Sequence, residues 1–290
     1  MAIPPCCGLD HGGRASNFGD FGTNGEPQGW FAAVEPVQDS LAVILPDGEV
    51  VPFDSDLWAH HTSGSSAETV QFYEQRALLW AKDLRFALDN LAQLTQEKSS
   101  PFYGAINLRR IGAFGHSHGG RAAAAACLLD SRITACLNED GRLDEGQLQR
   151  PYWPIPGHRI SGAFAMLDWF DPGLDQADLT GMHTTIAEYA IRRLEANGAR
   201  LNSYRDVDGR SHHLSILTPG MQHSEFTDLP WLTSNSETSR SRHLKHLELV
   251  RRALVALFDS GLRNQPTFLT NCNSSYDAIL IQCYLQDEGH

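Results

Sequence analysis

The stretch that decides the fold is the hexapeptide Gly115-His116-Ser117-His118-Gly119-Gly120. Residues 106–114 before it (INLRRIGAF) are an apolar run that predicts a strand, and residues 121–129 after it (RAAAAACLL) are strong helix formers. A Gly-x-Ser-x-Gly sequence between a strand and a helix is typical of a nucleophile elbow, where glycines leave room in a tight turn. The serine then stands at a helix N-terminus, which favours a developing oxyanion. We expect Ser117 to be a nucleophile; the alternative is a Gly-rich turn with a bystander serine.

Composition and charge limit the class of protein. The chain has 290 residues, 41% of them hydrophobic and 20% charged, which suits one sizeable α/β domain and argues against extensive disorder. The formal net charge of -12 disfavours nucleic acid or an anionic membrane as the main partner. No apolar run reaches the length of a membrane span and no secretory leader is recognisable. As the sequence is given we expect a cytoplasmic protein, and a secreted one if its start is incomplete.

Apolar periodicity predicts strands and helices in alternation. The expected strands are 30–37, a hairpin of 41–45 and 49–53, then 133–137, 159–167 and 214–217; the other expected helices are 68–94, 185–196 and 243–258. Residues 58–67 predict a loop. Alternation implies parallel strands with right-handed crossovers, hence one α/β sheet covered on both faces. We expect a single domain over 1–290, irregular over 1–28, with a tail over 264–290 that has no clear pattern.

The six cysteines include no CxxC pair, so a zinc ribbon or a thioredoxin motif is unsupported. Cys127 and Cys136 fall in a predicted helix and a predicted strand, where we expect buried free thiols. Cys272 and Cys283 could form a disulfide, since a glycosylation sequon lies beside them. The redox compartment stays open.

The acid partner of Ser117 is sought after the next strand. A serine hydroxyl is a weak nucleophile that needs a histidine base, and the base needs a carboxylate that fixes its tautomer. In this fold class the chain order is serine, acid, histidine, each at a strand end. Asp140 follows the strand expected at 133–137, and Glu139 is its rival.

The base is chosen by its place relative to the strand at 214–217. His212 and His213 precede this strand, whereas His223 follows it. Because functional groups gather at the carboxyl ends of parallel strands, position favours His223. A surface histidine without function is the alternative for each.

Three motifs in order resemble the platelet-activating-factor acetylhydrolase family of α/β hydrolases. They are GHSHGG at 115–120, NEDG at 138–141 and GMQHSEFTD at 220–228, which is similar to the family's G-x-x-H-x-x-F-x-D pattern. WFAAVE at 30–35 and PDGEVVPFD at 46–54 also look like this group, and the similarity runs from about 29 to 258, weakly over 142–205.

The resemblance implies an α/β-hydrolase fold with Ser117, Asp140 and His223 as a catalytic triad. It further implies hydrolysis of short-chain acyl esters, such as the acetyl group of a phospholipid. The oxyanion would be held by the backbone N–H of His118, which stands where the family usually carries an aromatic residue. Family members have further strands at their start, one ending in an HGLG-like loop with a second oxyanion donor. Here Leu9 is the candidate at a fitting distance, and the resemblance leads us to expect a start that is truncated or divergent.

We expect a serine-dependent carboxylic-ester hydrolase that uses no cofactor. A metal is not expected, because His116-x-His118 and His60-His61 lack further ligands at a suitable spacing. The partner would be a small-molecule ester or a phospholipid, and no nucleic acid. Two other functions stay open: a catalytically impaired relative that acts as a binding protein, and an esterase of polyester or cutin-like substrates. Trp58, Trp169-Phe170 and Trp231 could line an acyl or lipid pocket, or pack in the core.

Overall fold

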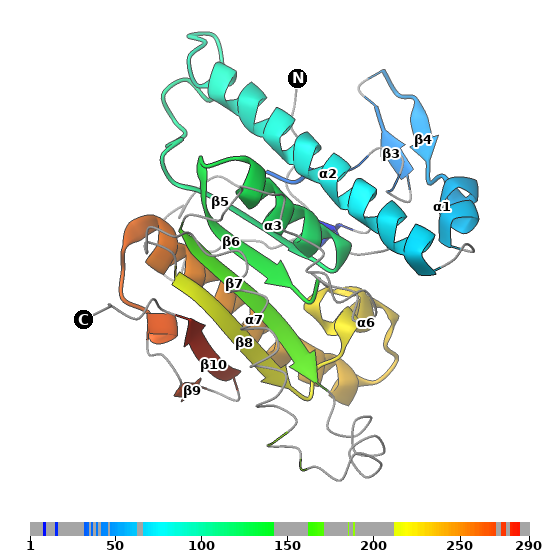
Figure 1. Ribbon diagram of the computed structural model, residues 1–290, viewed down its shortest axis with the longest axis vertical. Helices are drawn as coiled ribbons and strands as arrows, with labels where there is room; N and C mark the ends of the chain where they lie inside the picture. The colour runs from blue at the N-terminus through cyan, green and yellow to red at the C-terminus, as the bar shows by residue number, and fades with distance from the viewer. Residues whose placement is uncertain are drawn as a thin grey trace.

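A six-stranded sheet forms the centre of the computed structural model (Figure 1). Its strand order is β5-β6-β7-β8-β10-β9. The bounds are β5 Ile111–His116, β6 Ile133–Glu139, β7 Ala163–Phe170, β8 His212–Pro219, β9 Ser274–Tyr276 and β10 Ile279–Tyr284. The first four strands are parallel neighbours, and β10 and β9 continue the sheet antiparallel. The expected α/β architecture with a mostly parallel sheet is confirmed.

The structure describes only part of the chain. The described residues are 8–9, 15–16, 32–34, 36, 39, 42–45, 47–62, 66–141, 162–170, 185, 188, 212–270, 274–276 and 279–284. The helix expected at 185–196 lies outside them except for residues 185 and 188, and so does the excursion after residue 141. None of the helices within these ranges combines the length and the apolarity needed to cross a membrane.

Helices cover both faces of the sheet (Figure 1). Helices α2 (Ser66–Leu94) and α3 (His118–Leu129) lie on one face, in a core that includes Ala77, Ala123 and Phe164. Helix α7 (Glu237–Arg263) lies on the other, in a core that includes Leu137 and Leu254. Because side chains alternate along a strand, β6 and β7 contribute to both cores.

Shorter elements surround this centre. Strands β1 (Gly8–Leu9) and β2 (Ala15–Ser16) pair antiparallel, as do β3 (Ala42–Ile44) and β4 (Val50–Pro52), which form the expected hairpin. Helix α1 (Ser55–Thr62) precedes α2. The 3-10 turn η1 (His223–Phe226) and the short helix α6 (Leu229–Thr233) follow β8, and a second 3-10 turn, η2 (Phe268–Thr270), follows α7.

Two expectations about elements are wrong. The described residues of the strand expected at 30–37 (32–34 and 36) are not in a strand. Residues 58–67, expected as a loop, hold the end of α1 and the start of α2, and the Asp54 carboxylate caps α1 by accepting the Leu57 N–H at 2.9 Å. The tail, in which the sequence has no clear pattern, adds β9 and β10 to the sheet.

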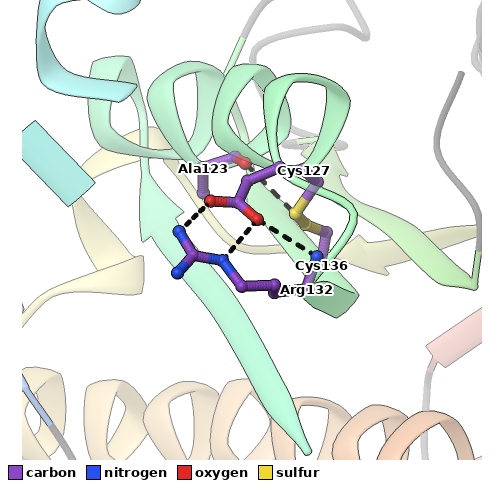
Figure 2. Close-up of a disulfide and its surroundings, with 5 residues drawn as sticks. Ala123, Cys127, Arg132 and Cys136 are labelled. Carbon is purple, nitrogen blue, oxygen red and sulfur yellow. Dashed lines mark hydrogen bonds and ion pairs between the residues drawn. A yellow bond between two sulfur atoms is a disulfide. The ribbon is translucent and has the colours of Figure 1, made fainter. Parts of the chain in front are cut away.

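A disulfide joins Cys127 of α3 to Cys136 of β6 (Figure 2). The expectation of two free thiols is therefore wrong. The two Cα atoms are 6.6 Å apart, a separation that a disulfide can span. Periodicity could not indicate this bond, because it depends on how α3 packs on β6. The possible disulfide between Cys272 and Cys283 is not tested, since Cys272 lies outside the described residues.

Candidate active site

Ser117 occupies a strained turn between β5 and α3. Its φ of 54° and ψ of -120° are rare for a residue with a side chain. The turn depends on close backbone approach: a Cβ on Gly115 would lie 2.5 Å from the Gly119 carbonyl carbon, and one on Gly120 would lie 2.6 Å from the Gly115 oxygen. The strand–turn–helix setting predicted for the hexapeptide is confirmed.

The three residues expected as a triad lie in one hydrogen-bonded series. Ser117 Oγ is 3.0 Å from His223 Nε2, and His223 Nδ1 hydrogen-bonds to Asp140 Oδ2. His212 and His213 lie at the start of β8, the opposite end from His223. The geometry therefore brings together Ser117, Asp140 and His223 from three loops, each after a different parallel strand.

Asp140 is held by backbone contacts to the strands on both sides. Its φ is 52°, and its N–H donates to the Leu167 carbonyl of β7 at 2.8 Å. One residue earlier, the Glu139 carbonyl accepts the Ser117 N–H at 2.7 Å. The Asn138 amide closes the turn through two hydrogen bonds with the Gly141 backbone, at 2.7 and 2.8 Å. The nucleophile turn and the acid turn are thus linked directly.

His223 begins the turn η1, which is anchored to α7. Glu225, two residues later, is buried; its carboxylate accepts the Gln222 N–H at 2.9 Å and lies 3.1 Å from His246 Nδ1 of α7. The other side of the His223 ring faces His116, with ring centroids 4.5 Å apart, and His116 stacks on Phe226. His223 itself is 43% exposed, so a ligand can reach it.

The surroundings of Asp140 determine its charge. Burial raises the pKa of Asp140, and the hydrogen bond from His223 opposes this rise. The negative charge of Asp168 raises the pKa further, and a hydrogen bond from Trp169 Nε1 lowers it. Glu139 behaves differently: burial alone raises its pKa to about 8, and its Oε1 has no hydrogen-bond partner among the described residues. The carboxylate that contacts the histidine is that of Asp140.

His118 packs into a group of aromatic rings beside the nucleophile. Its ring lies 4.6 Å from Trp80, 5.8 Å from Tyr73 and 6.2 Å from Trp58, measured between centroids. The fully buried Asp39 carboxylate orients two of these rings by accepting the indole N–H groups of Trp58 and Trp80, and it also pairs with Arg76. The imidazole of His118 thus packs among these rings as an aromatic side chain would.

The two expected oxyanion donors lie in different elements. His118 is the first residue of α3, where backbone N–H groups lack an intrahelical acceptor. Leu9 lies in β1, which packs beside β5. The role of both N–H groups stays a prediction.

Three side chains that could act as metal ligands meet at the candidate active site. One side-chain ligand atom from each of His116, Asp140 and His223 lies within 4.8 Å of the others, so these residues could hold a divalent cation. Sequence spacing does not reveal this grouping, because the parallel strands bring together residues that are distant in sequence.

A solved structure has a fold similar to that of this chain. No protein-family model and no curated protein sequence matches the chain. Among solved structures, a ferulic acid esterase from Streptomyces cinnamoneus is similar, with a TM-score of 0.55 and 21% sequence identity. The match covers 84% of this chain and 62% of the esterase chain, so the chain spans less than two thirds of that protein. The likeness shows a shared fold, and it gives no support to the narrower resemblance to acetylhydrolases.

Sequence reasoning missed several residues around the site. The sequence indicates only a pocket or core position for Trp169, although its indole hydrogen-bonds to Asp140. Asp39 and the Glu225–His246 pair were not considered at all. No local pattern identifies them, because each acts through a partner from a different element.

Proposed function

We propose that this chain has an α/β-hydrolase fold and hydrolyses carboxylic esters through Ser117. The observation that carries the proposal is the series Ser117 Oγ, His223 Nε2, His223 Nδ1 and Asp140 Oδ2. This is the arrangement that a serine nucleophile, a general base and an orienting acid require. The strained φ of Ser117 and the esterase fold neighbour support the same function.

In the acylation step, Ser117 Oγ attacks the ester carbonyl carbon while His223 Nε2 takes the hydroxyl proton. The carbonyl oxygen becomes an oxyanion beside the first N–H groups of α3, where His118 would donate. The intermediate collapses when His223 returns the proton to the leaving alcohol. Asp140 holds the imidazole in the tautomer with Nδ1–H and stabilises the imidazolium.

In the deacylation step, a water molecule replaces the alcohol. His223 Nε2 removes a proton from this water as its oxygen attacks the acyl carbon, and the same proton then returns to Ser117 Oγ. The products are the carboxylic acid and the free enzyme. His223 is partly exposed, which allows water to enter after the alcohol leaves.

The proposed substrates are esters of short acyl chains, including acetylated phospholipid, as the motif resemblance implies. The test is hydrolysis of p-nitrophenyl acetate by the wild type, by Ser117→Ala and by His223→Ala. We expect each substitution to lower kcat by about 10³-fold or more, because each removes a member of the triad. A folded wild-type chain without activity would contradict the proposal and favour a binding protein of the same fold.

A second candidate substrate is an ester of an aromatic acid. The aromatic rings of Trp58 and Tyr73 lie beside His118, and the fold neighbour is a ferulic acid esterase. Comparing kcat/KM for methyl ferulate with kcat/KM for methyl butyrate separates the two candidates. A Trp58→Leu variant should lose preference for the aromatic ester if that ring contacts the acyl group. Polyester hydrolysis, the third alternative, would require activity on longer chains.

A further inference from the structure

Trp169 of β7 contacts the acid of the hydrogen-bonded series directly. Its indole Nε1–H donates to Asp140 Oδ2, the same oxygen that His223 Nδ1 approaches. The carbonyl of Leu167, two residues earlier on β7, accepts the Asp140 N–H. We propose that Trp169 is a positioning residue, whose indole N–H aims the Asp140 carboxylate at His223. The proposal rests on the proposed function for its kinetic part.

Asp140 needs such a donor because of its surroundings. Its side chain is only 15% exposed, and burial is the largest influence raising its pKa. Asp168 is also buried and adds a like charge, which raises the pKa again. An indole N–H can only donate and does not titrate, so it favours the ionised carboxylate at every working pH. Among the described residues, His223 and Trp169 are the groups whose side-chain hydrogen bonds lower this pKa.

The indole itself is fixed in place. The backbone N–H of Trp169 donates to Asp168 Oδ1 at 2.8 Å. The backbone carbonyl of Asp168 accepts the Thr218 hydroxyl of β8 at 2.9 Å. The ring is partly buried against the core that faces α7. A fixed indole ring can orient the Asp140 carboxylate, whereas a mobile ring would donate its hydrogen bond to water instead.

The pair of variants Trp169→Phe and Asp168→Asn tests the proposal through opposite effects. Trp169→Phe removes the donor and keeps an aromatic ring. We expect kcat for p-nitrophenyl acetate to fall about tenfold with little change in KM, and the acidic limb of the kcat/KM profile to move to higher pH. Asp168→Asn removes the like charge, so its acidic limb should move to lower pH. The acidic limb reports an apparent pKa of the coupled Asp140–His223 pair. The two predicted directions of shift are the same whether the proton is assigned to Asp140 or to His223.

A second readout does not depend on catalysis. The Nδ1–H proton of His223 shared with Asp140 should give a far-downfield NMR resonance in wild type, and its position should change in Trp169→Phe. If wild type lacks activity but this resonance shifts, the ester-hydrolase function fails and the positioning role stands. If activity depends on Ser117 while the Trp169→Phe profile and resonance match wild type, the positioning role is overturned.

Folding defects are separated from positioning by a closer isostere. Site-specific replacement of Trp169 by benzothienylalanine keeps the bicyclic shape and exchanges only the N–H for sulfur. This variant should reproduce the shift of the acidic limb seen with Trp169→Phe. A loss of activity in both variants without any shift of the limb, or the same direction of shift in Asp168→Asn, would contradict the proposal.

Discussion

Asp140 and Glu139 are neighbours in the chain, yet their carboxyl groups lie in different surroundings. Asp140 receives hydrogen bonds from His223 and Trp169, whereas the Glu139 carboxyl is fully buried with Oε1 unpartnered among the described residues. The sequence left Glu139 as a rival acid because both follow the same strand. Neighbouring strand residues point to opposite faces, and the turn after β6 redirects only the second of the two toward His223.

The buried Glu139 should make stability fall as pH rises. Its pKa is about 8 in the folded chain and 4.5 ordinarily, so between these values the folded state holds a proton that the unfolded state has lost. In that window the free energy of unfolding decreases by at most about 1.4 kcal/mol per pH unit. Glu139→Gln should remove this decrease and become more stable than wild type at pH 8. Urea unfolding at pH 5, 6.5 and 8 measures the difference.

An exposed glutamate provides the control for this measurement. Glu97→Gln should leave the pH dependence of unfolding as it is in wild type. Parallel profiles for wild type and Glu139→Gln would show that Glu139 does not carry a raised pKa. Activity adds a further distinction, because Glu139→Gln should remain active while Asp140→Asn should lose activity.

The candidate site is assembled from the turns that follow β5, β6 and β8. Helices α1 and α2 pack against the turn after β5, because Trp58 and Trp80 contact the ring of His118. Asp39 holds this packing through a network of buried hydrogen bonds. It accepts from Trp58 of α1 at 2.9 Å, and from Trp80 and Arg76 of α2. Two helices are therefore fixed to one carboxylate from the loop before them.

Asp39→Ala should destabilise the fold by about 3–5 kcal/mol, because it leaves the Arg76 guanidinium without its partner in a mostly buried place. The double variant with Arg76→Leu should recover part of the loss, which a double-mutant cycle of urea unfolding measures. Asp89, which pairs with Arg132 and is 60% exposed, serves as the control. Asp89→Ala should change stability by about 0.5 kcal/mol or less. Equal effects of both substitutions would contradict the anchoring role of Asp39.

Elements with a local signal could be predicted from the sequence. The β3–β4 hairpin follows from Asp47-Gly48, where Gly48 has φ 89°, and the elbow follows from its glycines. Helix α1 was missed because His60-His61 and the Ser/Gly cluster indicate a loop, while its cap at Asp54 was not considered. Strand β10 was missed although it is apolar, because its antiparallel pairing with β8 depends on the rest of the sheet.

For the molecule as a whole, the order of the strands explains the site. Ser117, Asp140 and His223 are far apart in sequence, but β5, β6 and β8 run in the same direction, so the turns that follow these three strands meet at one edge of the sheet. This rule favours His223 over His212 and His213, whereas Ser117 is predicted from its motif and the choice of Asp140 over Glu139 rests on the family resemblance. The contacts of Trp169, Asp39 and Glu225 could not be predicted. They depend on how side chains pack between elements that are distant along the chain, and no sequence motif links these elements.

The two cores share one sheet, so they should unfold together. Phe164 faces α2 and α3, and Leu254 of α7 packs on the other face; both are essentially unexposed. Phe164→Ala and Leu254→Ala should each lower the free energy of unfolding by about 2–5 kcal/mol. In both variants, far-UV circular dichroism, tryptophan fluorescence and the proposed esterase activity should change in one coincident transition, because neither face can lose its packing without disturbing the strands that carry the site. Separate transitions in Leu254→Ala, with activity retained after α7 has melted, would show that the α7 face folds independently of the active-site turns.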